Sequence, residues 1–338
     1  MFAEMEAARA EALHVKPGPC GLKAILAIHS SRLGPALGGC RYGHYSNEQH
    51  ALDDALRLSE ALSYKAALAG LPYGGGKLVL IRPAHVANRA QLFAAVGDFI
   101  ESLGGRYIAA VGNGTSTLDM DNLAQQTGFV TSTSGLGDPA PYTALGVLAG
   151  IRATALARLG TDDLQGLRVS VLGLGQVGLN VAELLHAEGA ELYVSDIDAG
   201  KMQQAADTFN ARTVAPYQLI SHPCDLFVPC SHGHILNTTT VPELRCAAVA
   251  GAANNQLQSP EIAKLLESRG ILYAPDIVIS AGGLIHVALT YEGYAPEQTR
   301  SELARIATRL KEIFAIAQVD KRSPAEVACE LAQRILYD

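Results

Sequence analysis

The sequence has few charged residues, no basic run and no long apolar run, and these absences exclude several classes of function. A net charge of −7 without a lysine- or arginine-rich stretch argues against general nucleic-acid binding. No apolar stretch reaches the roughly 20 residues that a transmembrane helix needs. The N-terminal stretch MFAEMEAARAEALHV is acidic and amphipathic, unlike a signal peptide. We therefore expect a cytoplasmic protein without a membrane or nucleic-acid partner.

Cysteines are also few, and they follow no disulfide or zinc pattern. Cys224 and Cys230 stand six residues apart, but no second pair follows them. We expect reduced thiols and no metal site. The six cysteines are Cys20, Cys40, Cys224, Cys230, Cys246 and Cys329.

The 338 residues exceed the size of one ordinary hydrophobic core, so we expect two α/β domains. Residues 1–134 would form a substrate and oligomerisation domain, with residues 319–338 packing back on it. Residues 135–318 would form a doubly wound dinucleotide-binding domain of the Rossmann type, with a cleft between the two domains. Because nearly half of the residues are hydrophobic, we also expect buried surface between subunits and a homo-oligomer, a dimer or larger.

The stretch from Arg168 to Asp196 reads as strand, glycine turn, helix and strand. In such a unit Gly173 permits the tight turn, Gly175 lets a pyrophosphate approach the backbone, and Gly178 lets the helix lie close to the strand. The start of the helix then offers unpaired N–H groups to the phosphates. This turn predicts a dinucleotide site, which comprises Gly173, Leu174, Gly175, Gln176, Val177 and Gly178.

Asp196, 18 residues past Gly178, would stand at the tip of the second strand. There its carboxylate can accept hydrogen bonds from an adenine-ribose diol and repel a 2′-phosphate. Ser195 and Ile197 bring no arginine that would reverse this preference. We therefore expect NAD as the cofactor, with Ile197 beside it.

Two lysines mark the N-terminal half. Residues 23–30 predict a strand, and residues 31–42 read as a loop that exposes backbone N–H groups at Gly38 and Gly39. Ser46 or Asn47 would cap a helix to about Leu62, with Lys65 just beyond its end. A glycine run then precedes Lys77, which would lie at the start of a strand. One lysine can hold a substrate carboxylate, and the other can donate a proton to an imine or carbinolamine. Desolvation and mutual repulsion would lower at least one lysine pKa toward neutrality.

Several strings, taken together and in order, resemble the leucine, phenylalanine, valine and tryptophan dehydrogenase branch of the glutamate dehydrogenase superfamily. The resemblance covers about residues 22 to 336. It implies a substrate domain, a cleft and a Rossmann-type NAD domain, and the reversible oxidative deamination of an L-amino acid. The strings are LGPALGGCR (33–41), YKAALAGLPYGGGK (64–77), DPAPYTALGV (138–147), GLGQVG (173–178), AGAANNQL (250–257) and YAPDIVISAGG (273–283).

The resemblance also implies roles for single residues. Lys65 would hold the substrate carboxylate with backbone groups of Gly38 and Gly39, and Lys77 would be the catalytic acid/base. Asn254 would bridge substrate and nicotinamide, and Thr143 would lie near the cofactor. By position, Leu284 and Val287 would be walls of the side-chain pocket, whose substrate the sequence does not identify.

One position departs from this family. Relatives carry an aspartate in a pattern like AEDVGT after the strand GRYI, whereas this chain reads AAVGNGT and places Gly112 there. Asp119 and Asp121 are no substitutes, because the family has its own acids at those places. The missing carboxylate is thought to activate water and to exchange protons with the lysine. Without it, hydride transfer to a C=N bond stays reasonable, but attack of water on the iminium loses its base.

A second departure is the string from Cys230 to His234, CSHGH, where relatives have a small apolar Cys-Ala-Leu-Gly string. Histidine has an ordinary pKa suited to acid/base work near neutrality. His232 and His234 are therefore either exposed or hydrogen-bonded loop residues, or one of them replaces the missing aspartate. A His-x-His metal site lacks a third ligand of known proximity.

Three functions stay open at this point. The first is an NAD-dependent amino-acid dehydrogenase with a rearranged proton path. The second is an imine reductase that acts on preformed imines, cyclic ones included. The third is a non-catalytic relative that binds NAD or an amino acid without turnover. Lys65 and Lys77 disfavour it, because a protein without turnover has no chemical need for two lysines whose desolvation in a cleft costs free energy.

Overall fold

The computed structural model describes residues 2–18, 21–83 and 88–338, and its chain divides into two compact units. The first comprises Met1–Pro139, Leu284–Thr299 and Ala332–Asp338, and the second comprises Ala140–Gly283 and Arg300–Leu331. The expected ranges differ from these units at three places: residues 135–139 and 284–299 were assigned to the dinucleotide domain, and residues 319–331 to the first domain. The functional boundary at residue 134 stays a prediction.

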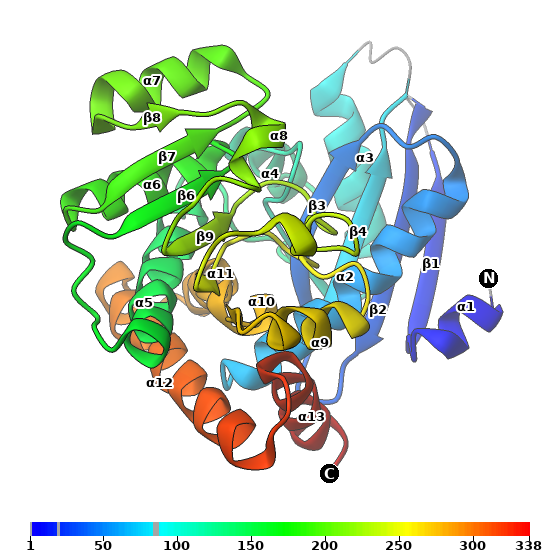
Figure 1. The fold of residues 1–338 in the computed structure, drawn as a ribbon. Coiled ribbons are helices and arrows are strands. Elements are labelled where there is room, and N and C mark those ends of the chain that lie inside the picture. The colour runs from blue at the N-terminus through cyan, green and yellow to red at the C-terminus, as the bar shows by residue number, and fades with distance from the viewer. Residues whose placement is uncertain (1, 19–20, 84–87) are drawn as a thin grey trace. The chain divides into compact units, whose positions relative to one another are not determined.

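The first unit is built on a five-stranded sheet with the order β1-β2-β4-β3-β5 (Figure 1). β1 and β4 both run antiparallel to β2, whereas β3 runs parallel to both β4 and β5. β4 and β3 are therefore inner strands. The elements are α1 (Phe2–Ala7), β1 (Ala12–Pro17), β2 (Lys23–Ser30), β3 (Ala36–Gly43), α2 (Glu48–Leu68), β4 (Gly74–Ile81), α3 (Arg89–Glu101), β5 (Tyr107–Ala110) and α4 (Thr117–Ala124).

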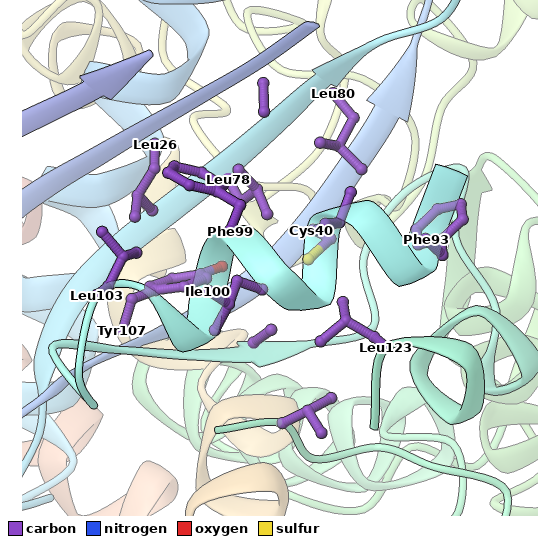
Figure 2. Close-up of a cluster of buried hydrophobic side chains, with 14 of the residues drawn as sticks. Leu26, Cys40, Leu78, Leu80, Phe93, Phe99, Ile100, Leu103, Tyr107 and Leu123 are labelled. Atoms are coloured by element: carbon purple, nitrogen blue, oxygen red, sulfur yellow. The ribbon is translucent and has the colours of Figure 1, made fainter. Parts of the chain in front are cut away.

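Helices cover both faces of this sheet because alternate strand residues point to opposite sides. On one face α3 and α4 pack against β2, β3, β4 and β5 in the cluster that Figure 2 shows. Phe93, Ile100 and Tyr107 are among its fully buried side chains, each worth about 1.5–3 kcal/mol of hydrophobic stabilisation. On the other face α2 packs Ala51 and Ala55 against strand residues that include Val79. The core of the unit thus has two layers, one on each side of the sheet.

Two sequence predictions in this unit are wrong. Residues 36–42 belong to strand β3 and not to a loop, because hydrogen-bonded neighbours on both sides hold this glycine-rich segment extended. The helix predicted to end near Leu62 continues to Leu68, so Lys65 lies in its last turn. Asn47, one of the two predicted caps, accepts a hydrogen bond from the His50 N–H at 2.9 Å. The strand predicted at 23–30 is confirmed as β2.

The second unit contains a parallel sheet with the order β11-β10-β9-β6-β7-β8 (Figure 1). This is the doubly wound order in which the first strand, β6, lies beside the fourth, β9, and ligands bind at the carboxyl ends of those two strands. The elements are α5 (Ala140–Leu159), β6 (Arg168–Leu172), α6 (Gln176–Ala187), β7 (Glu191–Ser195), α7 (Ala199–Phe209), β8 (Arg212–Thr213), α8 (Pro216–Leu219), β9 (Leu226–Pro229), η2 (Val241–Glu243), β10 (Ala248–Val249), α9 (Glu261–Ser268), β11 (Leu272–Tyr273) and α10 (Asp276–Ile279).

Three further helices each contribute residues to both units: α11 (Gly282–Tyr291), α12 (Pro296–Asp320) and α13 (Pro324–Tyr337). No helix in the described part of the chain is long and apolar enough to cross a membrane.

The five cysteines in the described part of the chain are all free thiols, and Cys20 lies outside the described residues. Two of these cysteines, Cys224 and Cys246, are neighbours in the second unit, although the sequence did not associate them. The Cys224 N–H donates to the Arg245 carbonyl at 3.1 Å, and the thiols of Cys224 and Cys246 are hydrogen-bonded. That bond lowers the pKa of Cys224 and raises the pKa of Cys246.

Candidate active site

Lys77 and Lys65 are both buried in the first unit. Lys77 lies in the middle of β4, opposite Ala27 of β2, and is 9% exposed, whereas Lys65 is 5% exposed. The sequence had placed Lys77 at the start of its strand, but the glycine run itself belongs to β4. Burial, and then the neighbouring Arg41, lower the pKa of Lys77 to about 7. Lys77 can therefore gain and lose a proton near neutral pH.

The glycine run explains how α2 comes close enough to carry Lys65 over this sheet face. A Cβ atom at Gly75 would lie 2.1 Å from the backbone nitrogen of Ser63. Since that distance is far shorter than any real contact, only glycine at this position lets α2 rest on β4. Lys65 follows Ser63 by two residues, so the close contact fixes the part of α2 that carries it.

Gly38 and Gly39 lie on β3, where they pair with Ala109 and Ala110 of β5. A Cβ atom at Gly38 would lie 1.9 Å from the carbonyl oxygen of Gly76, so the close packing of the strands requires glycine. The Gly38 carbonyl accepts a hydrogen bond from the Tyr107 hydroxyl at 2.5 Å. The proposed contact of these glycines with a substrate carboxylate stays a prediction.

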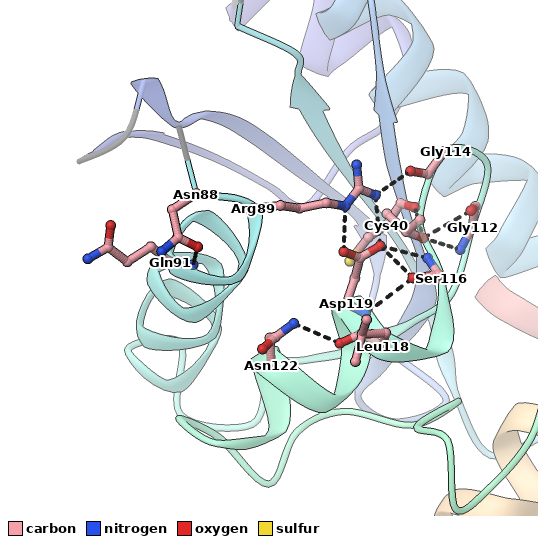
Figure 3. A network of polar contacts seen from close by, with 11 residues as sticks. Cys40, Asn88, Arg89, Gln91, Gly112, Gly114, Ser116, Leu118, Asp119 and Asn122 are labelled. Carbon is pink, nitrogen blue, oxygen red and sulfur yellow. Dashed lines mark hydrogen bonds and ion pairs between the residues drawn. The ribbon is translucent and has the colours of Figure 1, made fainter. Parts of the chain in front are cut away.

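Gly112 begins a tight turn directly after β5 (Figure 3). Its N–H donates to the Thr115 hydroxyl at 2.8 Å, and that hydroxyl lies 3.1 Å from the Cys40 carbonyl. A Cβ atom at Gly112 would lie 2.5 Å from the same carbonyl oxygen. The turn therefore sits against the β3 backbone and leaves no room for a side chain at this position.

Both acids that follow the turn are engaged in hydrogen bonds. Arg89 donates two hydrogen bonds to the Asp119 carboxylate, at 2.7 and 2.8 Å, and Ser116 donates two more (Figure 3). Burial raises the pKa of Asp119, but these hydrogen bonds outweigh it and lower the pKa overall. Asp121 accepts a hydrogen bond from the Ser134 N–H at 2.8 Å. Both carboxylates thus hold the local structure together.

Leu284 and Val287, the predicted pocket walls, lie on α11 within the first unit. They are 7% and 4% exposed and belong to an apolar cluster with Leu37, Ile108 and Ala110. The structure thus brings the two predicted residues together in one apolar environment. Their contact with a substrate stays a prediction.

The glycine turn of the second unit has the predicted strand–turn–helix context. Gly173 directly follows β6 with φ +99°, and a Cβ atom at Gly178 would lie 1.9 Å from the Gly173 carbonyl oxygen. Gly175 is the N-cap of α6 and makes no side-chain cap hydrogen bond. A Cβ atom on Gly175 would meet no atom within 4 Å. This open, uncapped helix start fits a pyrophosphate. Within the turn Leu174 is buried, Val177 is half-buried and Gln176 is exposed.

Asp196 follows β7 and lies beside the glycine turn. One carboxylate oxygen accepts from the Leu174 N–H at 2.6 Å, and the other accepts from the Asp198 N–H at 2.9 Å. Each oxygen retains a further lone pair, so the half-buried carboxylate can still accept hydrogen bonds from a ribose. Ile197 is 90% exposed next to it.

The string from Cys230 to His234 follows β9 and also lies beside the turn. A Cβ atom at Gly173 would lie 2.8 Å from the Ser231 nitrogen. His234, with φ +61°, donates its backbone N–H to the Asn255 carbonyl at 2.7 Å. His232 is exposed and His234 is half-buried. The described part of the chain has no group of three or more His, Cys, Asp or Glu side chains that could hold a metal ion.

Asn254 is exposed and lies in the same region, because a Cβ atom at Gly233 would lie 3.0 Å from its carbonyl oxygen. Thr143 lies in the first turn of α5, where its Cα atom would be 3.1 Å from a Cβ atom at Gly282. The structure thus places the glycine turn, Asp196 and the loops at 231–234 and 254–255 within the second unit.

One charged pair near Lys77 was not predicted from the sequence. Arg41 of β3 donates to the Asp54 carboxylate of α2 at 2.5 Å, and the Tyr45 hydroxyl donates to the same oxygen at 2.6 Å. An arginine in a strand whose other residues are apolar or glycine was the available signal. It went unused because these residues were read as a loop.

Known proteins resemble this chain over most of its length. Residues 14–129 match the Glu/Leu/Phe/Val dehydrogenase dimerisation domain, and residues 194–319 match the Glutamate/Leucine/Phenylalanine/Valine dehydrogenase domain. A leucine dehydrogenase of Geobacillus stearothermophilus is 43% identical over 314 residues, which cover 92% of this chain and 85% of that protein. A phenylalanine dehydrogenase of Bacillus thermotolerans is 41% identical over 323 residues, covering 93% and 85%.

The fold agrees with these sequence matches. The crystal structure of L-tryptophan dehydrogenase from Nostoc punctiforme superimposes with a TM-score of 0.81 at 38% identity, covering 99% of this chain and 98% of that one. The expected two-domain α/β fold, with a substrate domain and a Rossmann-like parallel sheet, is thereby confirmed. The chain belongs to the Glu/Leu/Phe/Val dehydrogenase family.

Proposed function

We propose that this chain is an NAD-dependent oxidoreductase that acts on the C–N bond of an amino acid, with a 2-oxo acid and ammonia on the other side of the reaction. The observation that carries this proposal is Lys77, a buried lysine with a pKa lowered to about 7, in a family of amino-acid dehydrogenases. A lysine of ordinary pKa would remain protonated near neutrality and could not work in both directions.

The first unit would bind the amino acid. Lys65 would hold its carboxylate with backbone groups of Gly38 and Gly39, and Leu284 and Val287 would contact its side chain. In the reductive direction the Lys77 ammonium donates a proton to the substrate. In the oxidative direction the neutral Lys77 amine accepts one.

The second unit would bind NAD, which accepts or donates the hydride when bound. The uncapped start of α6, with Gly173, Gly175 and Gly178, fits the pyrophosphate, and Asp196 fits the adenine ribose. Ile197, Thr143 and Asn254 would complete the contacts. NAD is proposed over NADP because the Asp196 carboxylate would repel a 2′-phosphate.

The test of this proposal is the reduction of NAD⁺ by the purified protein with a panel of L-amino acids. We expect NADH to form with at least one apolar amino acid, and Lys77→Ala to lower the rate by about a hundredfold or more. If no amino acid, oxo acid or imine gives turnover while NADH still binds, the chain is a non-catalytic relative and the proposal is wrong.

A second candidate, an imine reductase, is favoured by one observation. Deamination needs a base that activates water, and Gly112, where the resemblance implies an aspartate in the family, leaves no room for a side chain. Hydride delivery to a preformed C=N bond needs only the proton that Lys77 supplies. The relative rates with a preformed imine and with an oxo acid plus ammonia separate the two candidates.

His232 or His234 remains the proposed replacement for the missing base. Both lie on the loop beside the glycine turn, where the second unit would hold the nicotinamide cofactor. We expect one of the variants His232→Ala and His234→Ala to lower deamination while leaving imine reduction unchanged. Unchanged deamination in both would remove the histidines from the mechanism.

We also propose that the protein is a homo-oligomer. The family domain matched by residues 14–129 is described as a dimerisation domain. Sedimentation of the purified chain tests this directly, and a mass of one chain of 35.5 kDa at micromolar concentration would contradict it.

A further inference from the structure

The surroundings of Lys77 contain an ion pair that the proposed reaction does not use. β3 and β4 are parallel, with Cys40 opposite Leu78 and Arg41 opposite Val79. This register places Gly39 opposite Lys77. Because side chains alternate along a strand, Arg41 points to the same face of the sheet as Lys77, two residues further along β3. Arg41 is therefore a diagonal neighbour of Lys77.

Asp54 forms the ion pair with Arg41 from α2, which covers the same face of the sheet. The side chains of Arg41 and Asp54 are 27% and 15% exposed, and their closest atoms lie 2.5 Å apart. The Tyr45 hydroxyl donates a second hydrogen bond to the carboxylate. Since water screens this partly buried pair only weakly, its two charges act on their neighbours more strongly than surface charges do.

The charged and titratable groups around Lys77 come from two elements. β3 brings Arg41 and the thiol of Cys40, and α2 brings Asp54 and Lys65. β2 places only Ala27 opposite the lysine, and Gly112 after β5 has no side chain. Asp54 is thus the carboxylate whose negative charge raises the pKa of Lys77.

We propose that the Arg41–Asp54 ion pair sets the charge of Lys77, with Asp54 stabilising the ammonium and Arg41 stabilising the neutral amine. Asp54 then supplies a negative charge near Lys77, which Gly112 cannot supply because it has no side chain. Arg41 prevents this counter-charge from fixing the lysine in its protonated form. Both are positioning residues that act through Lys77, and only the catalytic consequence of the inference rests on the proposed function.

The direction of each effect follows from Coulomb's law and agrees with the environment of the lysine. Burial lowers the pKa of Lys77 most, Arg41 lowers it further, and Asp54 raises it. A role that is only structural makes a different prediction. Because either substitution breaks the same ion pair, a structural role would shift the pKa of Lys77 in the same direction in both variants.

The test compares Asp54→Asn with Arg41→Gln by NMR titration of the Lys77 side chain in protein labelled with ¹³C-lysine. The Lys77 resonance is the one that disappears in Lys77→Arg. We expect Asp54→Asn to lower the pKa of Lys77 and Arg41→Gln to raise it, each by about 0.5–1 unit, a threefold to tenfold change in the protonation equilibrium. Tyr45→Phe, which loosens Asp54 without changing a charge, should leave the pKa unchanged.

Shifts of the same sign in both variants, or no shift in either, would overturn the inference. If one variant does not fold, the other still decides, because each has its own predicted sign. If neither folds, Arg41→Lys decides: it keeps the charge, so a pKa more than about 0.3 unit from wild type contradicts the inference. The titration needs no turnover, so it stays informative if the proposed function fails.

Discussion

The carbonyl oxygen of Cys40 lies 2.5 Å from the point where a Cβ atom on Gly112 would stand. Gly112 is not in the left-handed region of backbone conformation, so close packing against β3, and not φ, demands glycine here. The Thr115 hydroxyl ties the turn and β3 together through contacts with both residues. The turn after β5 is therefore built around the absence of a side chain.

Gly112→Ala and Gly112→Asp form a matched pair because both add the same Cβ atom. Each must push the turn away from Cys40, and we expect each to lower the free energy of unfolding by about 1–3 kcal/mol, as overpacking does. Relative to Gly112→Ala, Gly112→Asp should raise the rate of deamination, since only the aspartate adds a base. Denaturant unfolding and steady-state rates of both variants check this; equal deamination rates in two folded variants would show that a carboxylate at this position is not the missing group.

The pH dependence should follow the charge of Lys77. Because its folded-state pKa is lowered to about 7 from an ordinary 10.5, the amine is neutral above that pH and protonated below it. Reduction uses the ammonium, so its kcat/KM should fall as the pH rises through about 7. Oxidation uses the neutral amine, so its kcat/KM should rise over the same interval. A reductive profile that is flat from pH 6 to 9 would exclude Lys77 as the proton donor.

Substitution of the two lysines should affect different kinetic constants. Lys77→Ala should lower kcat by about a hundredfold or more, because a positioned proton donor is lost. Lys65→Ala should mainly raise KM for the substrate carboxylate and change kcat less. Lys23→Ala, at a lysine that is 60% exposed, is the control and should leave both constants unchanged. Near-normal kinetics in both buried-lysine variants would mean that the substrate binds elsewhere.

Cofactor preference should depend on Asp196. We expect the wild type to use NADH with at least about tenfold higher kcat/KM than NADPH, and Asp196→Asn to reduce that ratio by removing the charge that repels a 2′-phosphate. The asparagine retains one oxygen that can accept from the Leu174 N–H. Asp198→Asn is the matched control, because Asp198 caps α7 and should not affect the choice. A wild-type preference for NADPH would show that Asp196 does not contact the ribose.

The sequence predicted the second unit well because its signals are local. The turn at 173–178 and the acid at 196 fall within one strand–turn–helix–strand segment, and the structure keeps them adjacent. β3 was missed because its glycines, and the Gly34–Pro35 pair just before it, resemble a loop. Pairing with β4 and β5, which a single sequence does not reveal, makes it a strand.

The electrostatics of Lys77 were predictable only in part. Burial near a second lysine implied a lowered pKa, and the pKa is indeed lowered. The Arg41–Asp54 pair was not predicted, because its members lie on different elements and meet only when α2 packs on the sheet. The lack of space at Gly112 was not predictable from the sequence either, since it depends on the backbone of Cys40.

The most direct test of the central claim measures NADH oxidation by the pure protein in two parallel reactions. One contains a 2-oxo acid with ammonia, and the other contains a preformed cyclic imine that carries a carboxylate. A chain that has Lys65 and Lys77 but glycine at 112 should reduce the imine faster, by about a hundredfold or more, because only imine formation needs a base that exchanges protons with water. Absence of NADH oxidation in both reactions, with NADH binding intact, would contradict the claim that this protein is an oxidoreductase of C–N bonds.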